Sequence, residues 1–111
     1  MNDAYLVAKL NVQGCSGVVV KDGVLYSCDT TPEFLIIPKG VCSLYKGCLS
    51  GQDNLIEVTL PDTIQNIGLS CFANCPNLKL IRVPESLKDF ESVLKYGNSA
   101  RVEYVSDSRK E

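Results

Sequence analysis

The strongest constraint in this chain of 111 residues is a repeat of fixed length. A proline that ends a short aliphatic run recurs every 23 residues, at Pro38, Pro61 and Pro84. Periods of about 20 to 50 residues are typical of solenoids, in which each repeat packs only on its neighbours. The sequence therefore predicts a solenoid of about three coils, whose function depends on the few side chains of its exposed surface.

Alignment of the repeats on their prolines shows positions that are apolar in successive copies. Equivalent residues of paired strands lie about 4.7 to 5 Å apart, so each set predicts one column of the core. The columns are Val41, Ile64 and Leu87; Leu44, Ile67 and Phe90; Cys48, Cys71 and Leu94; Leu49 and Phe72; Leu55 and Leu78; Val58 and Ile81.

The segment before each proline is predicted to be a strand, because proline donates nothing to a ladder and is tolerated at a strand end. The predicted strands are residues 35–37, 57–60 and 80–83. Residues 17–27 predict a β-hairpin around Lys-Asp-Gly, in which Gly23 takes the positive φ that a short turn requires.

The third repeat differs from the others. Its apolar residues at positions 87, 90, 93 and 94 have helical spacing and predict a helix over 86–96. Ser86 and Asp89 resemble a capping-box pair, and Gly97 is a C-terminal stop. Residues 100–105 predict a last strand, whose register the sequence leaves open by one residue.

These predictions divide the chain into one domain, residues 1–105, and a flexible tail, residues 106–111. The ends of a solenoid need caps, because they expose unpaired strand edges. We assign residues 1–34 to an N-terminal β cap containing the hairpin, 35–83 to the repeat coils, and 84–105 to a C-terminal capping coil of helix and strand.

The central repeat, LPDTIQNIGLSCFANCPNLKLIRVP, is similar to the BspA-like, or Treponema-type, leucine-rich repeats. Their unit is an aliphatic strand ending in proline, then I-x-x-I-G, a small residue and Phe, a Cys, and a Leu that begins the next strand. Residues 23–38 also resemble the lead-in strand pair of that family, so the resemblance covers roughly residues 23–90. The matching residues are Pro61, Ile64, Ile67, Gly68, Cys71, Phe72, Cys75, Leu78 and Ile81.

The resemblance implies a right-handed, β-rich superhelix of the α/β type. It also implies protein recognition, often by adhesins on bacterial cell surfaces. It carries over no catalytic residue, because the positions of the motif belong to the core.

Charge and hydropathy exclude several classes of protein. Eleven basic and thirteen acidic residues give a net charge of −2, and no basic run exceeds Arg109-Lys110, so the footprint of a nucleic-acid-binding protein is absent. No apolar run approaches the roughly 18 residues of a membrane span, and MNDAYLVAKL lacks the features of a signal peptide. The sequence predicts a cytoplasmic protein, with a cell-surface or secreted protein as the alternative.

The alternative rests partly on the cysteines, at positions 15, 28, 42, 48, 71 and 75. Their even number permits three disulfides in an exported chain. Cys48 and Cys71 share a column and should lie close together, while Cys71 and Cys75 are spaced as on one helical turn. Both Cys71 and Cys75 fall on repeat positions, and the chain has neither a histidine nor a Cys-x-x-Cys pair. Buried thiols are therefore favoured over disulfides or a metal or redox site, and we expect no metal or cofactor.

Catalysis finds little support. A serine or cysteine nucleophile usually recruits a histidine as base, and the chain has none. Asp53, Glu57 and Asp62 lie within ten residues and are the candidates for a carboxylate pair. Acidic residues in turns and on strand faces are usually solvated, and no glycine-rich phosphate loop occurs. We therefore predict that the protein is not an enzyme.

Binding of another molecule is the remaining possible function, and we expect it on the outward faces of the strands. Side chains alternate along a strand, so the residues between the inward-pointing aliphatic residues should point outward. They form either a binding surface or a solvated sheet face without a partner. Ile36 and Leu80 could form one apolar spot, and Tyr26 and Tyr45 would support an interface if exposed. The face is predicted to comprise Ile36, Glu57, Thr59, Leu80 and Arg82, with Glu103 as an extension.

The sequence thus predicts a non-enzymatic protein–protein interaction module that binds a protein partner. The alternatives are a fragment of a bacterial cell-surface adhesin and, as an outside case, a thiol redox or metal-binding protein. The sequence leaves the identity of the partner and the oligomeric state open.

Overall fold

The computed structural model of the protein describes residues 17–105. The predictions for residues 1–16 and for the tail at 106–111 lie outside these described residues. The elements are β1 (Val19–Lys21), β2 (Val24–Ser27), β3 (Phe34–Ile36), β4 (Ser43–Leu44), β5 (Glu57–Thr59), β6 (Asn66–Ile67), β7 (Leu80–Pro84), the 3-10 helix η1 (Glu85–Phe90), α2 (Glu91–Lys95) and β8 (Arg101–Val105).

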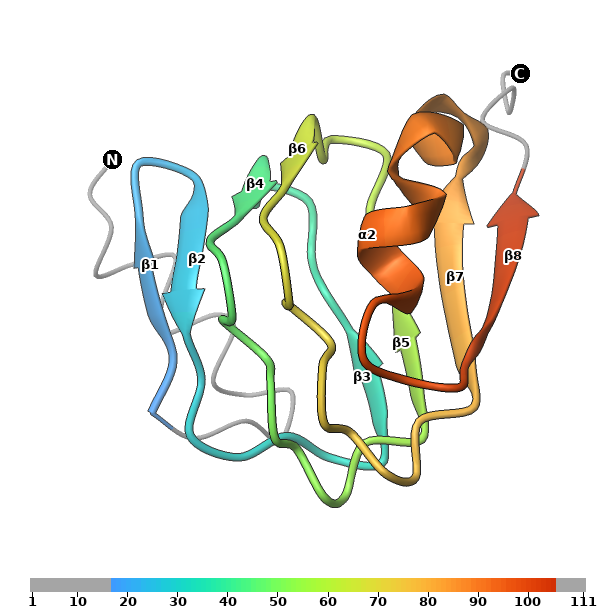
Figure 1. The fold of residues 1–111 in the computed structure, drawn as a ribbon. Helices are drawn as coiled ribbons and strands as arrows, with labels where there is room; N and C mark the ends of the chain where they lie inside the picture. The colour runs from blue at the N-terminus through green and yellow to red at the C-terminus, as the bar shows by residue number, and fades with distance from the viewer. Residues whose placement is uncertain (1–16, 106–111) are drawn as a thin grey trace.

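The strands form two four-stranded sheets, with the orders β1-β2-β4-β6 and β3-β5-β7-β8. Apart from the antiparallel hairpin β1-β2, every pairing between the described strands is parallel. Leu35, Val58 and Ile81 are register partners in the sheet β3-β5-β7-β8, which we call the longer sheet. Leu44 pairs with Ile67 in the sheet β1-β2-β4-β6, which we call the shorter sheet. Equivalent strands of successive repeats therefore pair without slippage, and successive turns of the chain lie side by side (Figure 1).

The strands predicted before the prolines are confirmed to within a residue at each end. The prediction gave each repeat only one strand, however, and missed β4 and β6. These strands have two residues each, which is too short to show an alternating pattern in the sequence. They are fixed by their ladder with β2.

The predicted columns form the core. All their members are buried except Phe90, which is partly buried and packs against the core. Phe72 is the largest fully buried side chain of the described residues. Apolar burial of this kind is the dominant favourable term in folding.

A side-chain hydrogen-bond donor also recurs at one position of each repeat and bonds each unit to the preceding one. The side chain of Gln52 donates to the carbonyl of Cys28 at 3.0 Å, and that of Cys75 donates to Leu49 at 3.3 Å. Asn98 donates to the carbonyl of Phe72 at 3.2 Å. This inter-unit donor position satisfies backbone carbonyls at turns where no strand ladder reaches them.

The predicted hairpin is confirmed. Its turn residues Asp22 and Gly23 have φ values of 54° and 80°, as in the two-residue turns whose twist matches that of the strands. Strand β2 also pairs in parallel with β4, so the hairpin continues the ladder of the repeats. The boundary between cap and coils at residue 34 stays a prediction.

The single helix predicted over 86–96 is wrong. A 3-10 helix, η1, comes first and is followed by the short α2, and Leu87 within η1 has non-helical angles of −99° and 18°. Helix η1 begins after Pro84 with no side-chain cap, so Ser86 and Asp89 form no capping box. Burial of Leu87 and Leu94 on the columns decides the path here, since ideal helical spacing would carry the chain off the register of the repeat. Gly97, with φ 77°, ends the segment as predicted.

The pairing of β8 with β7 gives the register of the last strand, which the sequence left open by one residue. Leu80 pairs with Arg101 and Val83 with Tyr104, so the last turn of the chain is shorter than the turns before it. The hydroxyl of Tyr104 donates to Glu91 Oε1 at 2.8 Å, which joins β8 to α2. Neither helix in residues 17–105 is long and apolar enough to cross a lipid bilayer.

Replacement of the central aromatic ring tests the core. Phe72→Ala should lower the free energy of unfolding by about 3 to 5 kcal/mol, because it leaves a cavity in a column closed on all sides. Phe34→Ala is the matched control, since Phe34 is exposed, and should cost less than about 0.5 kcal/mol. Urea titration of both variants measures the difference, and similar losses would mean that the register of the core is wrong.

The contact between β8 and α2 should be visible as a pH dependence. Burial, together with the hydrogen bond to Glu91, raises the pKa of Tyr104 to about 12 from an ordinary value of 10.0. The stabilisation by the neutral phenol should be complete below pH 10 and should disappear as the pH rises to about 12. Urea midpoints measured across this range should fall more steeply for the parent protein than for Tyr104→Phe, and parallel curves would contradict the assignment.

Candidate protein-binding face

The outer face of the longer sheet consists of two rows of side chains. Residues Leu35, Val58 and Ile81 point into the core, so their neighbours on either side point outward. The register places these neighbours in rows that cross the sheet. The rows are Phe34, Glu57, Leu80 and Arg101, and then Ile36, Thr59, Arg82 and Glu103.

Position within the sheet decides which apolar residues of this face are exposed. Phe34 and Ile36 lie on the edge strand β3 and are 59% and 62% exposed. Leu80 lies on the inner strand β7 and is only 8% exposed, because Glu57 and Arg101 flank it in its row and long side chains cover neighbouring apolar surface with their stems. The expected spot of Ile36 with Leu80 is therefore wrong, and Phe34 replaces Leu80 beside Ile36.

Phe34 is the residue that the sequence analysis missed. The predicted strand began at residue 35, one residue too late, so that Phe34 was assigned to the N-terminal cap of residues 1–34 and not to the face. Its position one repeat before Glu57, which was already assigned to the face, is the signal that could have found it.

An ion network occupies the middle of the face. Arg82 Nε donates to Glu103 Oε1 at 2.9 Å, and Arg82 Nη1 donates to Glu57 Oε1 at 3.2 Å. The three side chains come from the strands β5, β7 and β8, so the network crosses the sheet. The hydrogen bond to Glu103 and the charge of Glu57 raise the pKa of the Arg82 guanidinium. All three groups are partly exposed, so they orient one another more than they stabilise the fold.

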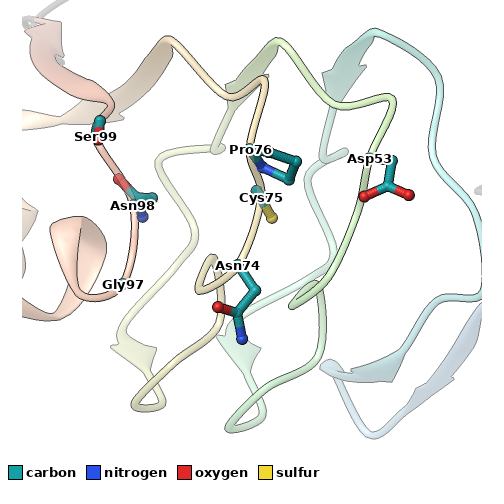
Figure 2. Close-up of a pocket in the computed structure, with 7 residues that line it drawn as sticks. All are labelled: Asp53, Asn74, Cys75, Pro76, Gly97, Asn98 and Ser99. Carbon is teal, nitrogen blue, oxygen red and sulfur yellow. The ribbon is translucent and has the colours of Figure 1, made fainter.

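A separate open hollow of about 340 Å³ lies on the turns that precede β5, β7 and β8 (Figure 2). Its polar groups include the carboxylate of Asp53, the amide of Asn74 and the hydroxyl of Ser99. The amide of Asn98 is already bonded to the backbone, and Cys75 is buried. Equivalent turns of three successive units contribute the lining: Asp53; Asn74, Cys75 and Pro76; Gly97, Asn98 and Ser99.

The three candidate catalytic carboxylates have different surroundings. Glu57 is bonded to Arg82, Asp62 forms an ion pair with Lys39 at 3.6 Å, and Asp53 lines the hollow. The structure thus gives each of them a different partner or environment and does not present them as one site. In residues 17–105 no three His, Cys, Asp or Glu side chains are grouped to hold a metal ion.

The sulfur atoms of Cys48 and Cys71 lie 3.9 Å apart, which confirms that the shared column brings them together. Both are buried thiols, as are Cys28 and Cys75, whereas Cys42 is exposed. The hydrogen bond that Cys48 donates to Cys71 raises the pKa of Cys48, as does burial, and lowers the pKa of Cys71, which accepts it. Burial raises the pKa of Cys75. Cys15 lies outside the described residues.

Residues 18–101 match the family model of the BspA type leucine rich repeat region (6 copies). The chain belongs to the BspA-type leucine-rich repeat family. No curated protein matches the chain, and no solved structure matches it. The match to the BspA-type repeats begins at the hairpin β1-β2, in agreement with the parallel pairing of β2 with β4.

Membership of the BspA-type family confirms the resemblance seen in the sequence. Its apolar motif residues Ile64, Ile67, Phe72 and Leu78 are buried here. These motif residues therefore belong to the core and not to the outward rows.

Accessibility of the thiols gives a direct test of this placement. In a Cys15→Ser background, one thiol should react with iodoacetamide in minutes at pH 8, because Cys42 is exposed and the other four are buried. All five should react after unfolding in guanidinium chloride. Intact mass measured over time gives the count, and the additional change Cys42→Ser should abolish the fast phase. Fast reaction of two or more thiols would show that the columns open in the native state.

Proposed function

We propose that this protein is a non-enzymatic interaction module that binds a protein partner through the outer face of the sheet β3-β5-β7-β8. The observation that carries the proposal is the combination of two exposed apolar side chains, Phe34 and Ile36, with an adjacent ordered ion network. An apolar anchor next to oriented charges is the arrangement that interfaces use for affinity and for specificity, respectively.

In this proposal the scaffold is a short right-handed solenoid of about three coils. The constant register of both sheets supports it, as does the family. Such a scaffold presents one side chain per coil in each outward row, so that the face is as wide as the stack of strands. The side chains that we assign to binding are Phe34, Ile36, Glu57, Thr59, Arg82 and Glu103. Leu80 is covered and supports the face from below.

The test begins with isolation of a partner on the immobilised full chain, followed by calorimetric titration of the purified partner. Changing both Phe34→Asp and Ile36→Asp should weaken binding about 100-fold, roughly tenfold for each lost anchor. Tyr96→Asp is the control, because Tyr96 is 53% exposed but follows α2, away from the face. Equal affinity of the parent protein and the double variant at unchanged melting temperature would refute the proposal.

We further propose that the protein acts in the cytoplasm. The buried thiols of Cys48, Cys71 and Cys75, which form no disulfide, support this, because disulfides are rare in reducing compartments. Incubation with an oxidising glutathione buffer should leave the intact mass and the free-thiol count after denaturation unchanged. Specific disulfides formed without loss of the fold would favour the alternative, a cell-surface protein of the adhesin type.

A further inference from the structure

Strand β3 is an edge of the longer sheet, because within residues 17–105 it pairs with β5 alone. The carbonyl of Glu33 accepts a hydrogen bond from β5 at 3.0 Å, and Ile37 N–H donates one to β5 at 2.9 Å. Successive residues of a strand direct their backbone groups to opposite sides. The N–H and C=O groups of Phe34 and Ile36 therefore point away from β5, toward the open edge.

The same two residues carry open apolar side chains. Ile36, at 62%, and Phe34, at 59%, are the most exposed of the large apolar residues in the described part of the chain. Strand β3 itself, Phe-Leu-Ile, contains no charge that would protect its edge. Pro32 and Pro38 flank it, and since proline donates nothing to a ladder, they confine pairing at this edge to the short segment between them.

A second copy of the chain matches this edge about a two-fold axis at Leu35. In an antiparallel pair centred there, Phe34 of each copy lies opposite Ile36 of the other. Each such pair exchanges two backbone hydrogen bonds, because both residues direct their N–H and C=O groups outward. Leu35 takes the non-hydrogen-bonded position, since its backbone groups face β5. The edge of β3 is thus complementary to itself in both its backbone groups and its apolar side chains.

The charges at the two ends of the segment favour the antiparallel orientation. The carboxylates of Asp29 and Glu33 precede the segment, and Lys39 follows it, in an exposed ion pair with Asp62 at 3.6 Å. An antiparallel pair brings Glu33 of one copy to the same end of the contact as Lys39 of the other. A parallel pair would bring like charges together instead, Glu33 beside Glu33 and Lys39 beside Lys39.

The remaining charges of the outer face stay outside the contact. Glu57 lies on the next strand and is bonded to Arg82, and the two β3 strands of such a dimer separate it from Glu57 of the other copy. Glu103 and Arg101 lie on β8, at the far edge of the sheet. The contact is therefore an apolar centre between charged flanks, as in protein interfaces generally.

We propose that the protein forms a weak two-fold dimer through the open edge of β3, which joins two sheets of four strands into one of eight. Specific, stable interfaces bury about 1,200 to 2,000 Å². Two strands of three residues each bury less than this, so the dimer dissociates readily. The second copy covers Phe34 and Ile36 and competes with the protein partner for them. This competition, unlike the dimer itself, rests on the proposed function.

Sedimentation equilibrium of the full chain, from about 10 μM to about 1 mM, tests the dimer. The weight-average mass should rise with concentration toward twice the mass of the chain. Phe34→Lys should weaken self-association at least about tenfold, because it removes an apolar contact from both pairs. The matched control is Tyr45→Lys. Tyr26 and Tyr45 are also exposed, at 38% and 46%, but they lie on the shorter sheet, so this variant should associate like the parent protein.

Cysteine cross-linking tests the register independently of the strength of the dimer. In a Cys15→Ser, Cys42→Ser background, a mixture of Phe34→Cys and Ile36→Cys should form more disulfide-linked dimer than either variant alone, because only the mixture places two cysteines directly opposite. Unchanged melting temperatures show that the variants are folded.

A single-chain mass at every concentration, or equal self-association of the parent protein and Phe34→Lys, would overturn the proposal. Equal cross-linking in the mixture and in the separate variants would overturn it as well. Neither experiment contains the protein partner, so failure of the dimer leaves the proposed function intact. Failure of the partner titration likewise leaves the dimer intact.

Discussion

The parallel pairing of equivalent strands in successive repeats is the constraint on which the rest of the structure depends. It places Leu35, Val58 and Ile81 directly beside one another, and it does the same for the other strand positions of the repeat. An apolar position then becomes a continuous column, and an outward position becomes a row across the surface. The core and the proposed binding face are two consequences of the same register, because alternate residues of one strand serve each.

Much of this scaffold could be predicted from the sequence, because a column needs an apolar residue in every copy. The positions of Ile64, Phe72 and Leu78 are legible for that reason, and the contact of Cys48 with Cys71 follows from their shared place in the repeat. What could not be predicted are features without periodicity of their own. The strands β4 and β6 are too short to alternate, and the kink at Leu87 arises because the columns compete with helical geometry.

The candidate site was predicted less completely than the core. Alternation identified the outward positions Ile36, Glu57 and Arg82, but exposure also depends on neighbouring strands. Leu80 is covered because β7 is an inner strand, while Phe34 is open because β3 is an edge strand. Nor does the sequence show that Arg82 bonds two carboxylates at once, since Glu57 and Glu103 meet it only through the fold. The exposed residues of this face thus differ from the predicted ones because exposure depends on neighbours in the fold and not on residue type alone.

The inter-unit donor position bears on how a protein of this kind can change in length. Gln52, Cys75 and Asn98 are chemically different, yet each donates its hydrogen bond backward to the preceding unit. Each unit thus contributes the hydrogen bond that attaches it to the preceding unit, as well as its own part of the core. Duplication of one whole repeat within a gene would therefore add a unit that carries its own core residues and its own hydrogen bond to the preceding unit. It would lengthen the outward rows without changes to the other repeats. A deletion of one residue within a strand would have the opposite effect, because it would turn the later side chains of that strand from the core to the outer face.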